Sequence, residues 1–194
     1  MYKPGEGFKV IAITNRHIAK IPLASQVDRL CSNGIDTFIL REKDLTEKEY
    51  RELAEQVISV CEKHSADCIL HTFWKVAAEL GHKKIHLPLF ILERDYEKIK
   101  NAGFNTIGCS CHSIEEAVKA VNLGATYITA SHIYPTDCKK GLAPRGLEFL
   151  KNICDHMEIP VYALGGLKTD CSQFEEMALA GADGACLMSG LMTF

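Results

Sequence analysis

The chain has 194 residues, of which 47% are hydrophobic and 24% are charged, with a formal net charge of −3. This composition is typical of one globular domain with a sizeable core, and it excludes collagen-like and disordered chains. The 22 Lys and Arg residues are balanced by 25 Asp and Glu residues without a block of like charge, so neither nucleic acid nor a membrane surface is the expected partner.

Short apolar runs alternate with segments of helical period along the whole chain. The expected strands are Val10–Thr14, Thr37–Arg41, Asp67–Leu70, Lys84–Leu87, Thr106–Ser110, Tyr127–Ala130, Pro160–Leu164 and Gly184–Met188. The expected helices are Leu23–Ser32, Glu47–Lys63, Trp74–Leu80, Tyr96–Ala102, Ile114–Leu123, Gly146–His156 and Gln173–Ala180. Several strands are continuous apolar runs, which is typical of a parallel sheet buried on both faces.

Eight strand and helix units in succession predict an α/β fold, a single (β/α)8 TIM barrel with short loops over residues 1–194. An open doubly wound sheet is the structural alternative. Thr46 with Glu49, and Ser113 with Glu116, have the spacing of capping boxes at two helix starts.

The nine cysteines are scattered and include no Cys-x-x-Cys pair. They are interpreted as reduced thiols, which favours a cytoplasmic location. The first residues lack the charged head and apolar run of a signal peptide, and no apolar run is long enough to span a bilayer.

In a TIM barrel the chemistry lies on the loops that follow the strands. Arg41 and Lys43 are separated by one residue, so they leave a strand end on the same side and indicate an anionic ligand. Gly165-Gly166 and Ser189-Gly190 follow the last two expected strands and can hold a phosphate through backbone N–H groups. A solvated strand end and simple turns are the respective alternatives.

The longest loop, residues 131–143, contains His132. An imidazole that titrates near neutrality can take up a proton and return it, so His132 is the candidate catalytic residue. A purely structural role is the alternative for a single histidine. The other histidines at or near strand ends compete for the role; they are His71, His86 and His112.

Four segments in order along the chain resemble the thiamine phosphate synthase/TenI superfamily. They are Leu40-Arg-Glu-Lys43, Gly108-Cys-Ser-Cys-His-Ser113, the loop from Ser131 to Gly141 with Arg145-Gly146-Leu147, and Pro160 to Leu167. The resemblance implies a (β/α)8 barrel of thiamine biosynthesis, in agreement with the fold expected from periodicity.

The resemblance also implies that synthases hold magnesium with an Asn-Asp pair after strand three and an Asp after strand four. Here His71-Thr72 and the segment Pro88 to Ile91 stand at those positions, without a carboxylate. The loop after His132 resembles the TenI branch, whose members are thiazole tautomerases. We therefore expect an isomerase that aromatises a carboxythiazole phosphate, with His132 transferring the proton and without a metal or cofactor.

Further roles follow from the resemblance. Arg41 and Lys43 would meet the carboxylate or another anionic edge of the ligand. The phosphate would be held by Gly166, Met188 and Ser189, with Ser110 nearby, and the loop around the ring would be shaped by Thr136 and Lys139.

The expected partner is a small thiazole phosphate carboxylate, and a homodimer is left open as the assembly. Two alternatives remain for the function. One is a thiamine phosphate synthase with an unusual metal arrangement, and the other is a non-catalytic or regulatory protein that binds the thiazole phosphate.

Overall fold

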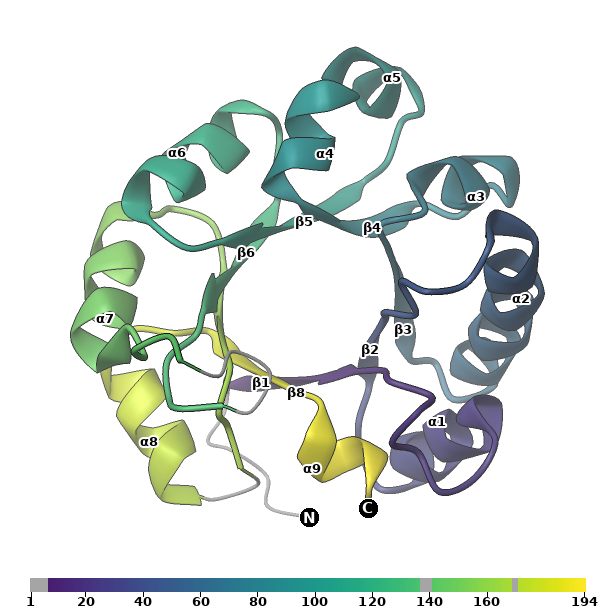
Figure 1. The fold of residues 1–194 in the computed structure, drawn as a ribbon, viewed down its shortest axis with the longest axis horizontal. Helices are drawn as coiled ribbons and strands as arrows, with labels where there is room; N and C mark the ends of the chain where they lie inside the picture. Colours follow the sequence, from purple (N-terminus) through teal and green to yellow (C-terminus); the bar gives the residue numbers. More distant parts are fainter. Residues whose placement is uncertain (1–6, 137–140, 169–170) are drawn as a thin grey trace.

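The computed structural model describes residues 7–136, 141–168 and 171–194. Its strands form one closed parallel barrel in which each strand pairs with the next and β8 pairs with β1 (Figure 1). The strands are β1 (Lys9–Ile13), β2 (Thr37–Leu40), β3 (Asp67–His71), β4 (Lys84–Pro88), β5 (Thr106–Cys111), β6 (Tyr127–Ser131), β7 (Val161–Leu164) and β8 (Gly184–Leu187). The predicted (β/α)8 barrel is confirmed, and the open doubly wound sheet is excluded.

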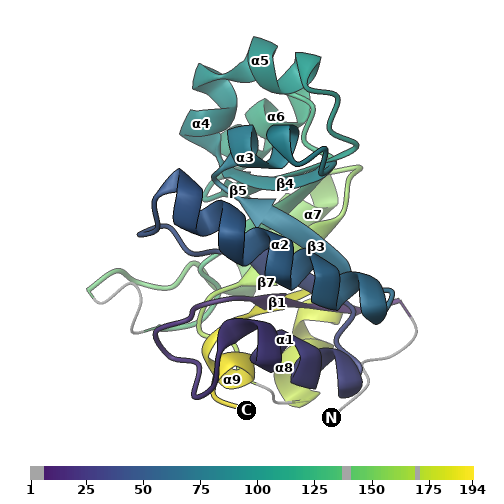
Figure 2. The same cartoon turned by 90° about the vertical axis from the view of Figure 1, so that its right-hand side faces the viewer.

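Helices surround the barrel as an outer layer in Figure 1, and Figure 2 shows the same arrangement from the side. They are α1 (Leu23–Ser32), α2 (Glu47–Lys63), α3 (Trp74–Glu79), α4 (Leu89–Arg94), α5 (Tyr96–Asn101), α6 (Ile114–Asn122), α7 (Gly146–His156), α8 (Cys171–Leu179) and α9 (Ser189–Met192). Helices α4 and α9 are not among the helices expected from the sequence. Helix α9 has only four residues, and α4 begins directly after Pro88 as an apolar run without the alternation of apolar and polar residues that shows a helical period.

The two expected capping boxes form to different extents. At the start of α2, the backbone N–H of Thr46 donates to Glu49 Oε2 at 2.9 Å, and Thr46 Oγ1 accepts from the backbone N–H of Glu49 at 3.3 Å. At the start of α6, Ser113 Oγ accepts from the N–H of Glu116, but the Glu116 carboxylate accepts from the N–H of His112 instead. The second box is therefore only half formed.

Buried side chains form two clusters, because alternate residues of each strand face opposite sides of the barrel wall. The large cluster lies between the strands and the helices and includes Phe38, Leu40 and Tyr50. The smaller cluster fills the barrel interior and consists of Ile11, Ile13, Ile39, Ile69, Tyr127 and Cys186. The interior also holds polar side chains from β4, β5 and β6, and these become important for the site.

Within the described part of the chain, no helix combines the length and the apolar character that crossing a membrane requires. The cysteines whose side chains are described are free thiols.

Candidate active site

The residues predicted to bind a substrate lie at one end of the barrel, because parallel strands place their carboxyl ends at one edge. We call this end the mouth. The residues there are Arg41 and Lys43 after β2, Ser110 near the end of β5, His132 and Thr136 after β6, Gly166 after β7, and Met188 and Ser189 after β8. Lys139 lies outside the described residues. The described members therefore share one face of the barrel.

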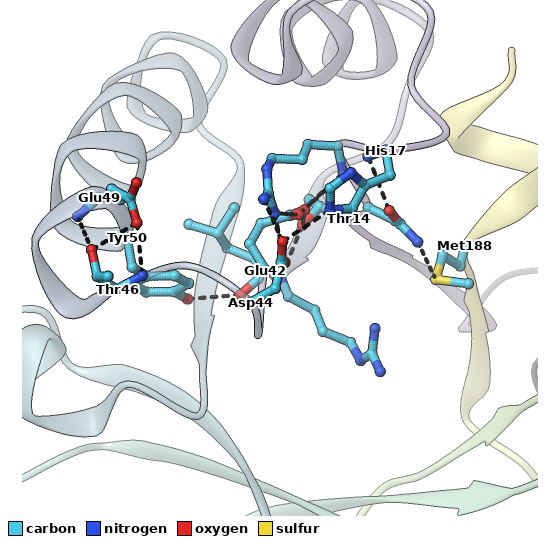
Figure 3. Close-up of polar contacts among 12 residues, drawn as sticks. Thr14, His17, Glu42, Asp44, Thr46, Glu49, Tyr50 and Met188 are labelled. Carbon is cyan, nitrogen blue, oxygen red and sulfur yellow. Dashed lines mark hydrogen bonds and ion pairs between the residues drawn. The ribbon is translucent and has the colours of Figure 1, made fainter.

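A buried carboxylate, Glu42, ties the ends of β1 and β2 together (Figure 3). Its Oε1 accepts a hydrogen bond from Thr14 Oγ1 at 2.7 Å and from the backbone N–H of Arg16 at 3.1 Å. Thr14 Oγ1 in turn accepts from the backbone N–H of Arg41 at 2.9 Å. This network fixes the backbone at Arg41, so it also fixes the direction in which Arg41 and Lys43 leave the strand end.

Arg16 is paired with carboxylates at the rim of the mouth. Its Nη1 lies 3.1 Å from Glu42 Oε2 and 2.7 Å from Asp44 Oδ1. Hydrogen bonds from Arg16, followed by one from His17, lower the pKa of Asp44 far below its usual range. The charge of Arg16 is therefore balanced locally.

The net positive charge of the mouth comes from Arg41 and Lys43. Neither forms an ion pair with a carboxylate of the described residues. Lys43 remains accessible to solvent, but the protein atoms around its ammonium group and the neighbouring charge of Arg41 lower its pKa. A lysine whose charge is disfavoured in this way gains from a bound anion. The pair gives the mouth two cations without a carboxylate partner among the described residues, and binding of an anion there stays a prediction.

Two buried imidazoles, His71 and His86, line the interior below the mouth. Their ring centroids are 5.4 Å apart in a stacked arrangement. Burial lowers the pKa of His71 well below its usual value, and the neighbouring His86 ring and the positive charges of Lys43 and Arg41 lower it further. Burial, and then the charge of Lys43, lowers the pKa of His86 to about 3. Both rings are therefore neutral at physiological pH.

His86 also connects two hydroxyl groups. Its Nδ1 lies 2.9 Å from the hydroxyl of Tyr127, and its Nε2 lies 2.8 Å from Ser110 Oγ. Ser110 is a site residue predicted from the sequence and His86 a predicted rival of His132, but the bridge between them was not predicted. The bridge depends on how the inward-facing residues of β4, β5 and β6 are aligned with one another. A single sequence does not define the register between these strands.

His132 is buried at the end of β6, with 4% of its surface exposed. Its Nε2 has no hydrogen-bond partner among the described residues. The rival candidate His112 is engaged, because its Nδ1 lies 3.0 Å from both the carbonyl oxygen and the hydroxyl of Ser131. The Nε2 of His132 is therefore unpaired but enclosed by protein, and the contacts of His112 with Ser131 use Nδ1 alone, so hydrogen bonding does not distinguish the two histidines as candidates.

The glycine pair after β7 packs against the loop that carries His132. A Cβ atom on Gly165 would lie 2.4 Å from the Cβ of His132, and one on Gly166 would lie 2.5 Å from the carbonyl oxygens of Tyr134 and Pro135. Both glycines also have positive φ. Close packing of two mouth loops therefore requires these glycines, whether or not they also hold a phosphate.

The loop after β8 contributes Met188 and Ser189. Asn15 Nδ2 makes a weak contact of 3.9 Å with Met188 Sδ, which links the ends of β1 and β8 (Figure 3). Ser189 begins α9, and its carbonyl oxygen accepts from Thr193 Oγ1 at 2.8 Å. Phosphate binding by this segment stays a prediction.

The magnesium ion that the resemblance implies for synthases needs oxygen ligands, usually including one or two carboxylates. Strands β3 and β4 end in His71 and Pro88 instead. The buried carboxylate at the mouth, Glu42, already accepts from Thr14 and Arg16. No group of three or more His, Cys, Asp or Glu among the described residues could hold a metal ion. The described residues therefore do not fit a magnesium site of that type.

The fold and the mouth together define a (β/α)8 barrel with a pair of cations, Arg41 and Lys43, at the carboxyl ends of its strands. The chain belongs to the thiamine monophosphate synthase family, whose sequence profile matches residues 10–191. It is 30% identical over 191 residues to the thiamine-phosphate synthase of Caldanaerobacter subterraneus, covering 95% of this chain and 86% of that protein. It is 28% identical over 192 residues to the thiamine-phosphate synthase of Clostridium acetobutylicum, covering 96% and 88%.

A solved structure gives the same picture. The thiamine phosphate pyrophosphorylase from Pyrococcus furiosus superimposes with a TM-score of 0.82 at 27% sequence identity. The match covers 97% of this chain and 89% of that chain.

These comparisons correct the predicted activity. The prediction of a thiazole tautomerase, and with it of an isomerase, is wrong, because relatives that match along nearly the whole chain are named thiamine-phosphate synthases, which are transferases. The prediction had rested on a few positions after β3 and β4 and in the loop after β6. Similarity over the whole barrel carries more weight than those positions.

Proposed function

We propose that this protein is a transferase of the thiamine-phosphate synthase type. It would join a thiazole phosphate to a pyrimidine pyrophosphate and release pyrophosphate. Relatedness along nearly the whole chain to proteins named for this activity carries the proposal. The pair of cations at the mouth supports it, because both substrates and the leaving group are anionic.

In this reaction the bond between the pyrimidine-bearing carbon and a pyrophosphate oxygen breaks, and the thiazole ring nitrogen forms a bond to the same carbon. Negative charge develops on the departing pyrophosphate. Arg41 and Lys43 would stabilise this charge, since neither is paired with a carboxylate of the described residues. Their proposed partner is thus the pyrophosphate and not a ligand carboxylate. No step of this proposal involves a metal ion, since the described residues do not fit one.

The remaining site residues keep the roles proposed from the sequence. Gly166, Met188 and Ser189 would contact the phosphate of the thiazole, and Ser110 would donate to an anionic oxygen. His132 is the exception, because its proton-transfer role belonged to the tautomerase prediction; its Nε2 is unpaired and enclosed by protein. Thr136 and Lys139 would shape the loop around the ring.

The direct test is incubation of the purified protein with a thiazole phosphate and a pyrimidine pyrophosphate across a range of magnesium concentrations. We expect thiamine phosphate to form and pyrophosphate to be released in equal amounts. In Lys43→Gln the KM for the pyrimidine pyrophosphate should rise about tenfold or more, because a hydrogen bond to a charged group is lost. Lys48→Gln, an exposed change in α2, is the matched control and should leave KM unchanged. Absence of product at every magnesium concentration would overturn the proposal.

A second candidate function is a non-catalytic protein that binds the thiazole phosphate. It is favoured by one observation, the neutral His71 and Pro88 at the ends of β3 and β4, where the synthases resembled here carry metal-binding carboxylates. Calorimetric titration with the thiazole phosphate distinguishes the two functions. Tight binding without product formation would establish this second function.

A further inference from the structure

The bridge formed by His86 spans three neighbouring strands inside the barrel. His86 lies on β4, Ser110 on β5 and Tyr127 on β6, and the imidazole contacts both hydroxyls at 2.8–2.9 Å. Only 2% of the surface of His86 is exposed, and 5% of that of Tyr127, whereas Ser110 is part-exposed. The chain of contacts therefore runs from a fully enclosed phenol to a hydroxyl that a ligand can reach.

The barrel wall makes room for this bridge at Gly108. A Cβ atom on Gly108 would lie 2.1 Å from Tyr127 Cζ and 2.4 Å from His86 Nδ1. Any side chain at this position would displace the imidazole or the phenol. The contact between His86 and Tyr127 thus depends on a glycine between them in the barrel wall.

Hydrogen-bond accounting indicates which ring nitrogen of His86 carries the proton. A neutral imidazole has one donor nitrogen and one acceptor nitrogen. Among the described residues, the hydrogen-bond partner of the Tyr127 hydroxyl is His86 Nδ1. If Nδ1 carried the proton, the buried phenolic O–H would be left without an acceptor, which is costly. The favoured arrangement has Tyr127 donating to Nδ1 and Nε2–H donating to Ser110 Oγ.

This arrangement determines what Ser110 offers a ligand. Its oxygen accepts from His86, so its own O–H is free to point elsewhere. On the neighbouring strand, Thr129 pairs with Ser110 in the sheet register, and its buried Oγ1 has no hydrogen-bond partner among the described residues. Of these two hydroxyl groups, that of Ser110 belongs to a part-exposed side chain, whereas Thr129 is fully buried.

We propose that His86 is a positioning residue that, anchored by Tyr127, makes Ser110 a hydrogen-bond donor to an anionic phosphate oxygen of the substrate. The inference rests on the proposed function, because it requires a phosphorylated substrate at Ser110. It goes beyond that function by stating why Ser110 donates and by identifying the two buried residues through which its direction is fixed.

A double-mutant cycle tests whether His86 acts through Ser110. Ser110→Ala should raise the KM for the phosphorylated substrate that it contacts about tenfold, with kcat changing less than about twofold. His86→Leu should raise the same KM to a similar extent, and the double variant should be no worse than either single variant. Additive losses would overturn the proposal, because they would show that His86 acts independently of Ser110.

The control is His82→Leu, which removes a partly buried imidazole ahead of β4, at the opposite end of the barrel from the mouth. His82→Leu should leave the KM for the thiazole phosphate and the KM for the pyrimidine pyrophosphate unchanged. Tyr127→Phe covers the case in which His86→Leu does not fold, because it removes one oxygen and retains the ring. It should raise the KM by at least about threefold through loss of the anchor.

Nitrogen-15 NMR of the imidazoles in the wild-type protein gives a readout that is independent of activity. We expect His86 to be neutral and protonated at Nε2, and a proton on Nδ1 would overturn the inference. If no thiamine phosphate forms, the proposed function fails, and the same variants are titrated with the thiazole phosphate by calorimetry. Weaker binding in Ser110→Ala and His86→Leu alike would then support the inference, and unchanged binding or no binding to the wild type would overturn it.

Discussion

The hydroxyl of Thr14 lies 2.7 Å from the carboxylate of Glu42 and at the same time accepts a hydrogen bond from the backbone N–H of Arg41. These contacts join the end of β1 to the end of β2 at the point where the cations of the mouth leave the barrel. Glu42, which lies between the two cations in the sequence, organises the backbone beneath them.

Removal of the Glu42 carboxylate should be strongly destabilising. In Glu42→Ala the hydroxyl of Thr14 and the N–H and guanidinium of Arg16 lose their buried acceptor, and we expect a loss of about 2–4 kcal/mol in the free energy of unfolding. Urea denaturation followed by circular dichroism measures it. Glu55→Ala, at an exposed position of α2, should change the free energy by less than about 0.5 kcal/mol. Equal stability of the two variants would contradict the role given to Glu42.

Gly166 should be intolerant of a side chain for two separable reasons. It has φ +72°, and a Cβ atom there would lie 2.5 Å from two carbonyl oxygens of the loop after β6. Gly34 has φ +90° but open space around it, so Gly34→Ala reports the backbone strain alone. We expect Gly34→Ala to cost about 1 kcal/mol and Gly166→Ala clearly more. Thermal unfolding measures both, and a similar loss in the two variants would show that the loop yields to the added methyl group.

The barrel was predictable because each strand is a short apolar run between helical segments. The bounds of α1, α2 and α7 agree with the pattern residue by residue, since each of these helices is at least ten residues long. The six residues of α4 were not predictable, because their apolar run does not show which face is buried.

The candidate site was predictable only in its outline. Polar residues after strands identify the mouth, and the spacing of Arg41 and Lys43 indicates an anion. The bridge from Tyr127 through His86 to Ser110 depends on the register between strands, which no local pattern encodes. The reaction was mispredicted because the absence of metal-binding carboxylates was taken to decide between two activities of one superfamily.

The stability of the protein should fall in mild acid because of its buried imidazoles. The pKa of His86 is lowered by burial to about 3, against 6.5 for an unperturbed histidine. Between these pH values the unfolded chain binds a proton that the native protein does not, so the free energy of unfolding decreases as the pH falls. One such group contributes a slope of up to about 1.4 kcal/mol per pH unit.

Urea denaturation between pH 4.5 and 7 measures this slope. His86→Gln should reduce it, whatever the change in stability at pH 7. His156→Gln replaces an exposed histidine at the end of α7 and should leave the slope of the wild type unchanged. A slope that is the same in all three proteins would show that His86 takes up its proton in the native state.

Lys43 should lower the thermal stability of the free protein slightly and raise its affinity for an anionic ligand. Its ammonium group is disfavoured by the surrounding protein and by Arg41, so Lys43→Met should leave the melting temperature of the free protein unchanged or slightly higher. The same change should lower the affinity for inorganic pyrophosphate about tenfold or more, and the affinity of the wild type should fall as salt is added. Calorimetry and thermal unfolding on the same samples measure the two effects, with Lys48→Met as the exposed control. A lower melting temperature with unchanged affinity would mean that Lys43 stabilises the fold and does not bind the anion.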